Sequence, residues 1–170
     1  MKLRKKTPHL KYKIEQKIVY PLQGVGQITS IEELDFQGKN LLYYIIYFDV
    51  PDMTVMIPVD KTDARGIRPI VNKRAAHKAL NVISENYQPI SADWKLRYQM
   101  NLDLLKRGSV LDIAKVVRTL YNRSKIKELP ILERKLFDNA LKLFIDEISY
   151  SLKKDKKEVE ELIFKKMEIT

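Results

Sequence analysis

Apolar residues recur with two different spacings along this chain, and the spacing changes near residue 72. Between residues 17 and 70, short runs of β-branched and aromatic residues are separated by turn residues, which is typical of strands. Residues 41–48 give the strongest strand signal, because they contain no charged or amide side chain. Beyond residue 72, apolar positions recur three or four residues apart, which indicates amphipathic helices. The pattern therefore predicts an α+β protein.

Five short strands with tight turns are expected in the first half, which predicts a small β-barrel of the SH3 or Tudor kind. Alternation within residues 24–31 predicts that Val25 and Ile31 lie on one face and Ile28 on the other. Turns are expected at 37–40 and 49–52. The predicted strands cover residues 17–21, 24–31, 41–48, 53–59 and 66–70.

The second half is expected to form an all-α bundle of five helices. Ser91 or Asp93 can cap the second helix, and Ser109 can cap the third. Asp155 with Glu158 resembles a capping box for the fifth. The predicted helices cover 73–85, 94–106 and 109–121, a long segment opened by Pro130, and the segment after Asp155.

Charge divides the chain in the same way as the spacing. The whole chain carries a formal net charge of +10, which favours an anionic partner. Residues 21–70 nevertheless hold seven acids against four bases, whereas residues 71–150 hold fifteen bases against nine acids. We therefore expect two modules with different partners, a barrel over 14–71 and a helical domain over 72–170, preceded by a basic tail over 1–13.

No arrangement of catalytic groups is visible, so we expect no enzyme, no metal and no cofactor. His9 lies in the expected tail, and His77 lies among lysines on a helix. Four aspartates could suggest a Mg²⁺ site, but they fall in turns, where aspartate is favoured for backbone hydrogen bonds. These residues are Asp49, Asp52, Asp60 and Asp63.

The expected location is the cytoplasm. The chain has no cysteine, and the basic N-terminus is not followed by the apolar run of a secretory signal. The longest apolar stretch, residues 41–48, is too short to cross a membrane as a helix.

Basic residues on the predicted helices allow a nucleic-acid surface, but acids interrupt them, so an ordinary solvated face remains open. The only tryptophan, Trp94, opens the second helix beside Lys95 and Arg97. Its spacing with Tyr98 favours the core face of that helix. A flat side chain between cations could instead stack on a base or wedge between bases.

Six separated segments resemble, in order, the CarD/CdnL family of transcription regulators. The match covers roughly residues 16–150. Its segments are KIVYPLQGVG at 17–26, MTVMIPV at 53–59, GIRPI at 66–70, WKLRYQMNL at 94–102, IAKVVRTL at 113–120 and ERKLF at 133–137.

The resemblance implies a Tudor-like barrel that binds the β-subunit lobe of bacterial RNA polymerase. It also implies a helical domain at the upstream edge of the promoter bubble, where the tryptophan wedges into the minor groove of double-stranded DNA and stabilises the open complex. We therefore expect a monomer that is associated with the nucleoid through the polymerase.

Individual sites follow from the same resemblance. The expected DNA-binding residues are Trp94, Lys95, Arg97, Arg134 and Lys135. The expected polymerase-binding residues are Leu34, Phe36, Thr54 and Met56.

The sequence departs from the family at several of these positions. Leu34 and Met56 stand where some members place polymerase-contacting arginines, and Gln23 replaces a frequent histidine. Leu96 and Gln99 replace basic residues near the tryptophan. The alternatives are a nucleic-acid-binding module without polymerase contact and an enzyme with an unrecognised site.

Overall fold

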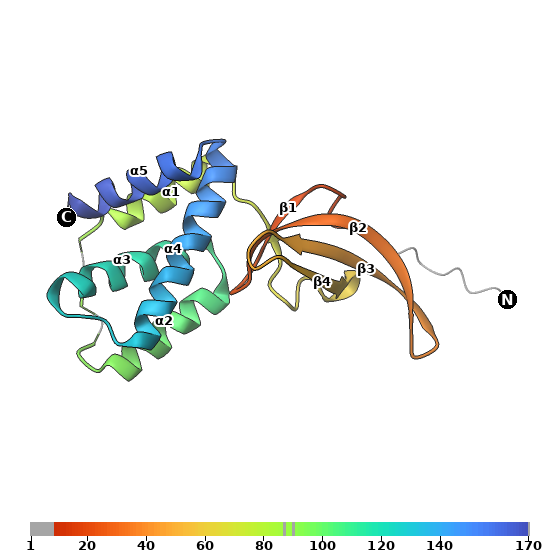
Figure 1. The fold of residues 1–170 in the computed structure, drawn as a ribbon, viewed down its shortest axis with the longest axis horizontal. Helices are drawn as coiled ribbons and strands as arrows, with labels where there is room; N and C mark the ends of the chain where they lie inside the picture. Colours follow the sequence, from red (N-terminus) through yellow and green to blue (C-terminus); the bar gives the residue numbers. More distant parts are fainter. Residues whose placement is uncertain (1–8, 87, 90, 170) are drawn as a thin grey trace. The chain divides into compact units, whose positions relative to one another are not determined.

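A computed structural model describes residues 9–86, 88–89 and 91–169, in which five strands precede five α-helices (Figure 1). The chain divides into two units. The first comprises the chain up to Tyr20 together with Val25–Pro69, and the second comprises Pro21–Gly24 and the chain from Ile70 onward. The main division after Pro69 lies two residues before the expected end of the barrel domain at residue 71.

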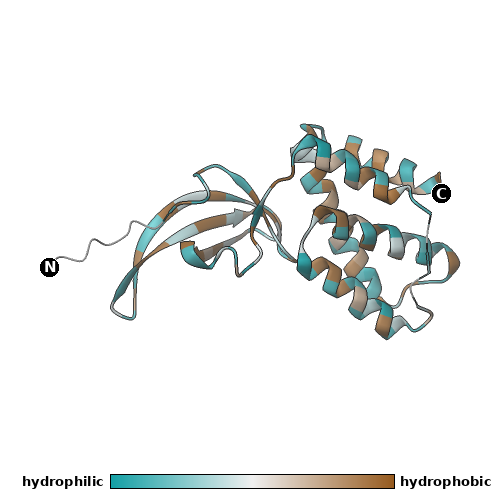
Figure 2. Cartoon of the chain, turned by 180° about the vertical axis from the view of Figure 1, so that it is seen from behind, coloured by the Kyte–Doolittle hydropathy of each residue, from teal (hydrophilic) through white to brown (hydrophobic). Residues whose placement is uncertain are grey.

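The first unit contains an antiparallel sheet with the strand order β4-β3-β2-β1-β5. It confirms the predicted α+β class, with a Tudor-like strand domain before a helical one. Figure 2 shows hydrophobic and hydrophilic stretches interspersed along these strands. The strands are β1 (Lys17–Tyr20), β2 (Gly24–Phe36), β3 (Lys39–Phe48), β4 (Met53–Pro58) and β5 (Arg68–Pro69), with a short 3-10 helix, η1 (Val59–Lys61), after β4.

The core of this unit includes Tyr12, a residue that the sequence assigned to the basic tail. Its side chain is buried, and its hydroxyl donates a hydrogen bond of 2.9 Å to the carbonyl of Ile67. The backbone amides of Lys11 and Tyr12 both donate to the Tyr44 hydroxyl. The expected tail boundary at residue 13 is therefore wrong, because lysines on either side of Tyr12 hide a core residue. Residues 1–8 of the expected tail lie outside the described residues.

Strand β2 also differs from the simple alternation that the sequence suggested. Ile28 is fully buried, and Ile31 packs against the same core instead of the opposite face. The pairing of β2 with β3 shifts register between Ile28 and Ser30, where a β-bulge places one extra residue. A bulge moves the residues beyond it to the other face of the sheet, so the expected separation of Ile28 and Ile31 is wrong.

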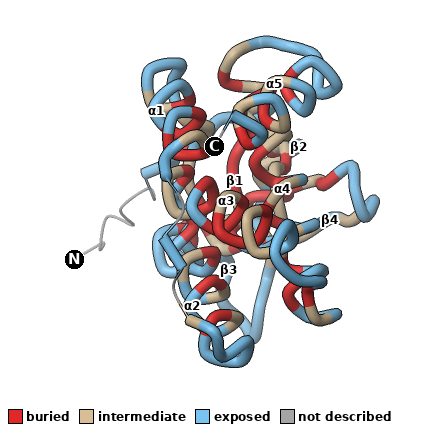
Figure 3. The backbone as a smooth tube through the Cα atoms, turned by 90° about the vertical axis from the view of Figure 1, so that its left-hand side faces the viewer, coloured by how far each residue is buried: buried red, intermediate tan, exposed pale blue. Residues whose placement is uncertain are grey.

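The second unit contains the five predicted helices. Their buried and exposed positions alternate along each helix, as the tube in Figure 3 shows. Helix α3 lies against α1, α2 and α4, and Ile113, Val117 and Leu120 on it are fully buried. The helices are α1 (Lys73–Ile83), α2 (Trp94–Arg107), α3 (Val110–Ile126), α4 (Ile131–Leu152) and α5 (Lys156–Glu168).

Polar side chains cap the helices where the sequence placed them. The Asp93 carboxylate accepts from the Lys95 amide at 2.9 Å, and the Ser109 hydroxyl accepts from the Asp112 amide at 3.1 Å. Asp155 caps α5 through the amide of Lys157. Because these caps bond amide groups that a helix start leaves free, they fix where each helix begins.

Candidate nucleic-acid interface

Trp94 is the first residue of α2 and lies at the surface of the helical unit. Its exposed fraction is 36%, and Leu96 and Met100 on the same helix are exposed by 53% and 41%. The Asp93 cap sets the start of the helix immediately before Trp94. The core placement that its spacing favoured is therefore wrong, and the indole is accessible to a partner.

Arg97, by contrast, is buried, and its exposed fraction is 1%. Its Nε atom donates a hydrogen bond of 2.7 Å to Oε1 of Glu133, and its Nη2 atom donates one of 2.7 Å to Oε2. Glu133 itself has an exposed fraction of 0%. Its Nη1 atom donates to the carbonyl of Ser91 at 2.8 Å. The expectation that Arg97 contacts DNA phosphates is wrong for this structure, because these internal acceptors engage the guanidinium away from solvent.

The buried stripe of α2 explains why apolar spacing wrongly predicts a core position for Trp94. Arg97, Asn101 and Leu105 follow one another at intervals of four residues and are all buried. The Asn101 side-chain amide donates to the carbonyl of Arg97 at 3.0 Å. Because two of these three residues are polar, apolar periodicity pointed to the neighbouring stripe, on which Tyr98 is only half-buried.

The other expected DNA-binding residues are exposed. Lys95 lies beside Trp94 in the first turn of α2, and Arg134 and Lys135 follow Glu133 in the first turn of α4. Arg134 approaches the Glu128 carboxylate at 3.9 Å, and both side chains are largely exposed. An exposed ion pair of that kind contributes little to stability, so Arg134 remains available to bind another anion such as a phosphate.

The two exposed groups are linked through the buried pair. Arg97 is one turn after Trp94, and Glu133 directly precedes Arg134. Their ion pair therefore joins the first turn of α2 to the first turn of α4, and the two helices are in contact. The structure thus connects Trp94 and Lys95 with Arg134 and Lys135, although these residues are far apart in the sequence.

The four expected polymerase-binding residues share the outer face of the strand unit. Leu34 pairs with Leu41 and Phe36 with Lys39, whereas Thr54 pairs with Tyr47 and Met56 with Ile45. The β3 partners of these residues are an even number of positions apart, so all four side chains leave the sheet on one side. Phe36 and Met56 are exposed by 57% and 56%.

The described sheet also has a free edge, formed by strand β4. Strand β4 is the last strand in the order β4-β3-β2-β1-β5, so its far side has no neighbouring strand in the described sheet. An end strand presents backbone donors and acceptors to which a partner strand can add. The exposed apolar side chain of Met56 on this edge strand favours a protein partner.

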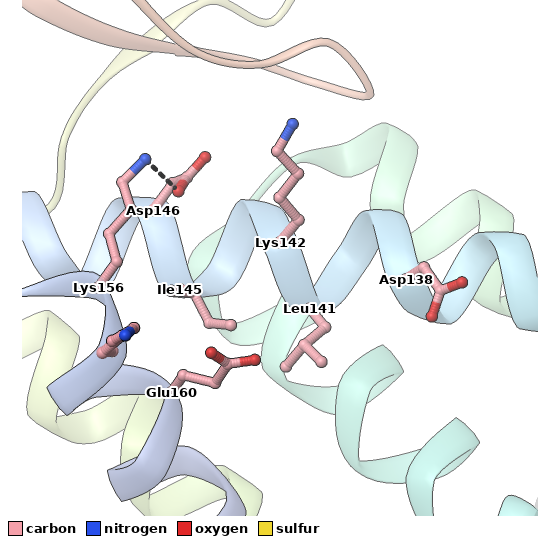
Figure 4. Close-up of a pocket in the computed structure, with 8 residues that line it drawn as sticks. Asp138, Leu141, Lys142, Ile145, Asp146, Lys156 and Glu160 are labelled. Carbon is pink, nitrogen blue, oxygen red and sulfur yellow. Dashed lines mark ion pairs between the residues drawn. The ribbon is translucent and has the colours of Figure 1, made fainter. Parts of the chain in front are cut away.

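A separate open groove of about 410 Å³ lies between α4 and α5 (Figure 4). Leu141 and Ile145 provide apolar lining, and Lys156 forms an ion pair of 2.8 Å with Asp146. Three carboxylates and three lysines line the groove in total, so its charges balance and do not select a phosphate. The lining residues are Asp138, Leu141, Lys142, Ile145, Asp146, Lys156, Lys157 and Glu160.

The described residues provide neither a metal site nor a membrane-spanning helix. No group of three or more histidine, cysteine, aspartate or glutamate side chains in this part of the chain could hold a metal ion. Within the same residues, no helix is long and apolar enough to cross a membrane.

Comparison with known proteins gives two family matches in order along the chain. Residues 12–71 match the CarD-like/TRCF RID domain, and residues 78–164 match the CarD C-terminal domain. The chain belongs to the CarD family. A CarD family relative, the candidate transcription factor YdeB of Bacillus subtilis (strain 168), is 36% identical over 137 residues, which cover 81% of this chain and 90% of YdeB.

The protein is thus a transcription factor of the CarD family. The first CarD match begins at residue 12, which agrees with the buried position of Tyr12 in the strand unit. The second match ends at residue 164, inside α5, so it extends beyond residue 150, where the resemblance in the sequence ended.

Proposed function

We propose that this CarD family protein binds the β-subunit lobe of RNA polymerase through its strand unit and promoter DNA through its helical unit. On this proposal it stabilises the open complex at the upstream edge of the bubble and uses no cofactor. The observation that carries the proposal is the exposed Trp94 at the start of α2, next to the exposed Lys95.

The DNA contact divides into a wedge and phosphate anchors. Trp94 enters the minor groove, where an apolar side chain can offset part of an unstacking cost of about a few kcal/mol per step. Lys95, Arg134 and Lys135 contact phosphates, which position the protein without reading sequence. Arg97 is not among the anchors, because it is buried.

The polymerase contact uses the outer face of the sheet. Phe36 and Met56 are exposed apolar side chains, and Leu34 and Thr54 lie on the same side. An apolar contact suits this protein, since Leu34 and Met56 replace the arginines that some members use. The match to the CarD-like/TRCF RID domain supports polymerase binding by this unit.

A gel-filtration experiment with RNA polymerase and a pre-melted promoter fragment tests the proposal. The full chain should co-elute with polymerase even when no DNA is present. In a separate decay measurement, it should also lengthen the lifetime of the polymerase–promoter complex. Binding to DNA without polymerase would favour a free-standing nucleic-acid module instead. Absence of both interactions would contradict the proposal.

A further inference from the structure

The buried pair of Arg97 and Glu133 lies between the two groups of residues proposed to contact DNA. We propose that Arg97 and Glu133 are positioning residues, which hold the Trp94 side chain and the Arg134–Lys135 anchors at one fixed separation. This inference rests on the proposed function for its purpose. Its structural content, which is the control of Trp94 by a buried ion pair, can be tested without DNA or polymerase.

The guanidinium of Arg97 ties three segments together. It bonds both oxygens of Glu133 in the first turn of α4, and it bonds the Ser91 carbonyl in the segment before the Asp93 cap. Arg97 itself lies in the first turn of α2, and its own amide donates to the Asp93 carbonyl at 3.0 Å. The backbone on both sides of Trp94 is therefore held by contacts of one residue, Arg97.

Apolar packing alone does not hold this end of α2. The buried residues of the helix are Arg97, Asn101 and Leu105, so its only fully buried apolar side chain lies near the C-terminal end. Tyr98 and Leu102 are half-buried. The first two turns, which carry Trp94, consequently depend on polar contacts for their fixed position.

A buried ion pair is an unusual choice if stability alone is required. Apolar residues of similar volume often replace such a pair without loss of stability, whereas the pair fixes one geometry through its directional hydrogen bonds. The planar guanidinium suits this role, because two parallel bonds to one carboxylate set both distance and orientation. The pair is therefore expected to matter more for the position of Trp94 than for stability. A variant that keeps the stability but loses the pair can test this.

The decisive variant is the double substitution Arg97→Met with Glu133→Leu in the full chain. It removes both charges together, so neither is left buried without a partner, and the melting temperature should stay within a few degrees of the wild-type value. Because Trp94 is the only tryptophan, its fluorescence reports on this site alone. Acrylamide quenching of that fluorescence measures how freely the indole is exposed.

We expect the quenching constant of the double variant to rise. The indole-bearing residue is 36% exposed in the structure, so its complete release would raise the accessible area roughly two- to threefold. Open complexes formed with the double variant should decay as fast as those formed with Trp94→Ala. A matched control, Arg118→Met with Glu85→Leu, removes another arginine–glutamate pair of the same unit and should leave the quenching constant unchanged.

Each outcome decides the inference. Unchanged quenching in a double variant that melts like the wild type would overturn it. If the double variant does not fold, Arg97→Lys decides, because it keeps the charge and loses the two-pronged bond: raised quenching supports the inference, and wild-type quenching overturns it. If the wild-type protein does not prolong open complexes, the proposed function fails, while the quenching result still decides whether the pair positions Trp94.

Discussion

Arg97 and Glu133 form a buried ion pair in which two nitrogens meet two oxygens, each at 2.7 Å. Neither side chain is appreciably exposed, and 36 positions separate them in the sequence. Arg97, which its charge alone would assign to DNA, is thus an internal residue that supports the residues proposed to bind DNA.

Glu133→Ala should therefore destabilise the helical unit strongly. The substitution leaves the Arg97 guanidinium buried without its carboxylate, which costs about 3–5 kcal/mol. Glu128→Ala is the matched control, because Glu128 meets Arg134 at the surface and its loss should cost about 0–1 kcal/mol. Urea unfolding of both variants measures the difference, and equal costs would contradict the buried geometry.

Tyr12 should make the strand unit sensitive to alkali. Burial raises the pKa of the Tyr12 hydroxyl above its ordinary value of 10.0, because the ionised form is disfavoured there. A raised pKa in the folded state means that stability is complete below pH 10.0 and falls as pH rises through the folded-state pKa. Unfolding free energies measured across this range should fall less steeply for Tyr12→Phe, and identical slopes would refute the assignment.

Phe36→Ala combined with Met56→Ala should weaken polymerase binding without unfolding the protein. Both side chains are more than half exposed, so the stability should change by about 0.5 kcal/mol or less per site. Loss of two apolar anchors should cost about 2 kcal/mol of binding, or roughly thirtyfold in affinity. Titration of labelled protein with polymerase measures this, with the exposed Val50→Ala as control. A wild-type affinity for the double variant would place the contact elsewhere.

Arg134→Ala combined with Lys135→Ala should weaken promoter retention on unrelated sequences to a similar extent. Each lost phosphate contact removes about 0.9 from the slope of log affinity against log salt, so the pair should lower it by about 2. Lys142→Ala combined with Lys165→Ala removes two exposed lysines from other positions and serves as the control. Retention measured at several salt concentrations tests this, and an unchanged slope would show that the pair does not touch DNA.

The order of strands and helices could be predicted from the sequence because apolar spacing reflects burial directly. Alternation failed at Ile28 and Ile31, since a β-bulge between them is invisible to a count of positions. Tyr12 was missed because neighbouring lysines dominate the composition of its segment. In each case a local pattern was overridden by a contact with a residue distant in the sequence.

Only part of the candidate site could be predicted, because the sequence does not show which residues contact one another across the fold. The resemblance identified Trp94, and the structure places it at the surface although its spacing favoured the core. The same resemblance assigned Arg97 to the DNA, because a sequence shows the charge of an arginine but not its partner. Only the position of Glu133 on another helix reveals that this arginine is internal.

The lifetime of open promoter complexes with Trp94→Ala, measured beside its melting temperature, tests the central claim most directly. The indole is partly exposed, so its removal should cost well below the roughly 3–5 kcal/mol expected for a buried tryptophan, and polymerase binding should be retained. The account predicts that open complexes decay faster with the variant than with the wild-type protein. A wild-type lifetime, or a shorter lifetime that accompanies a large loss of stability, would contradict the wedge.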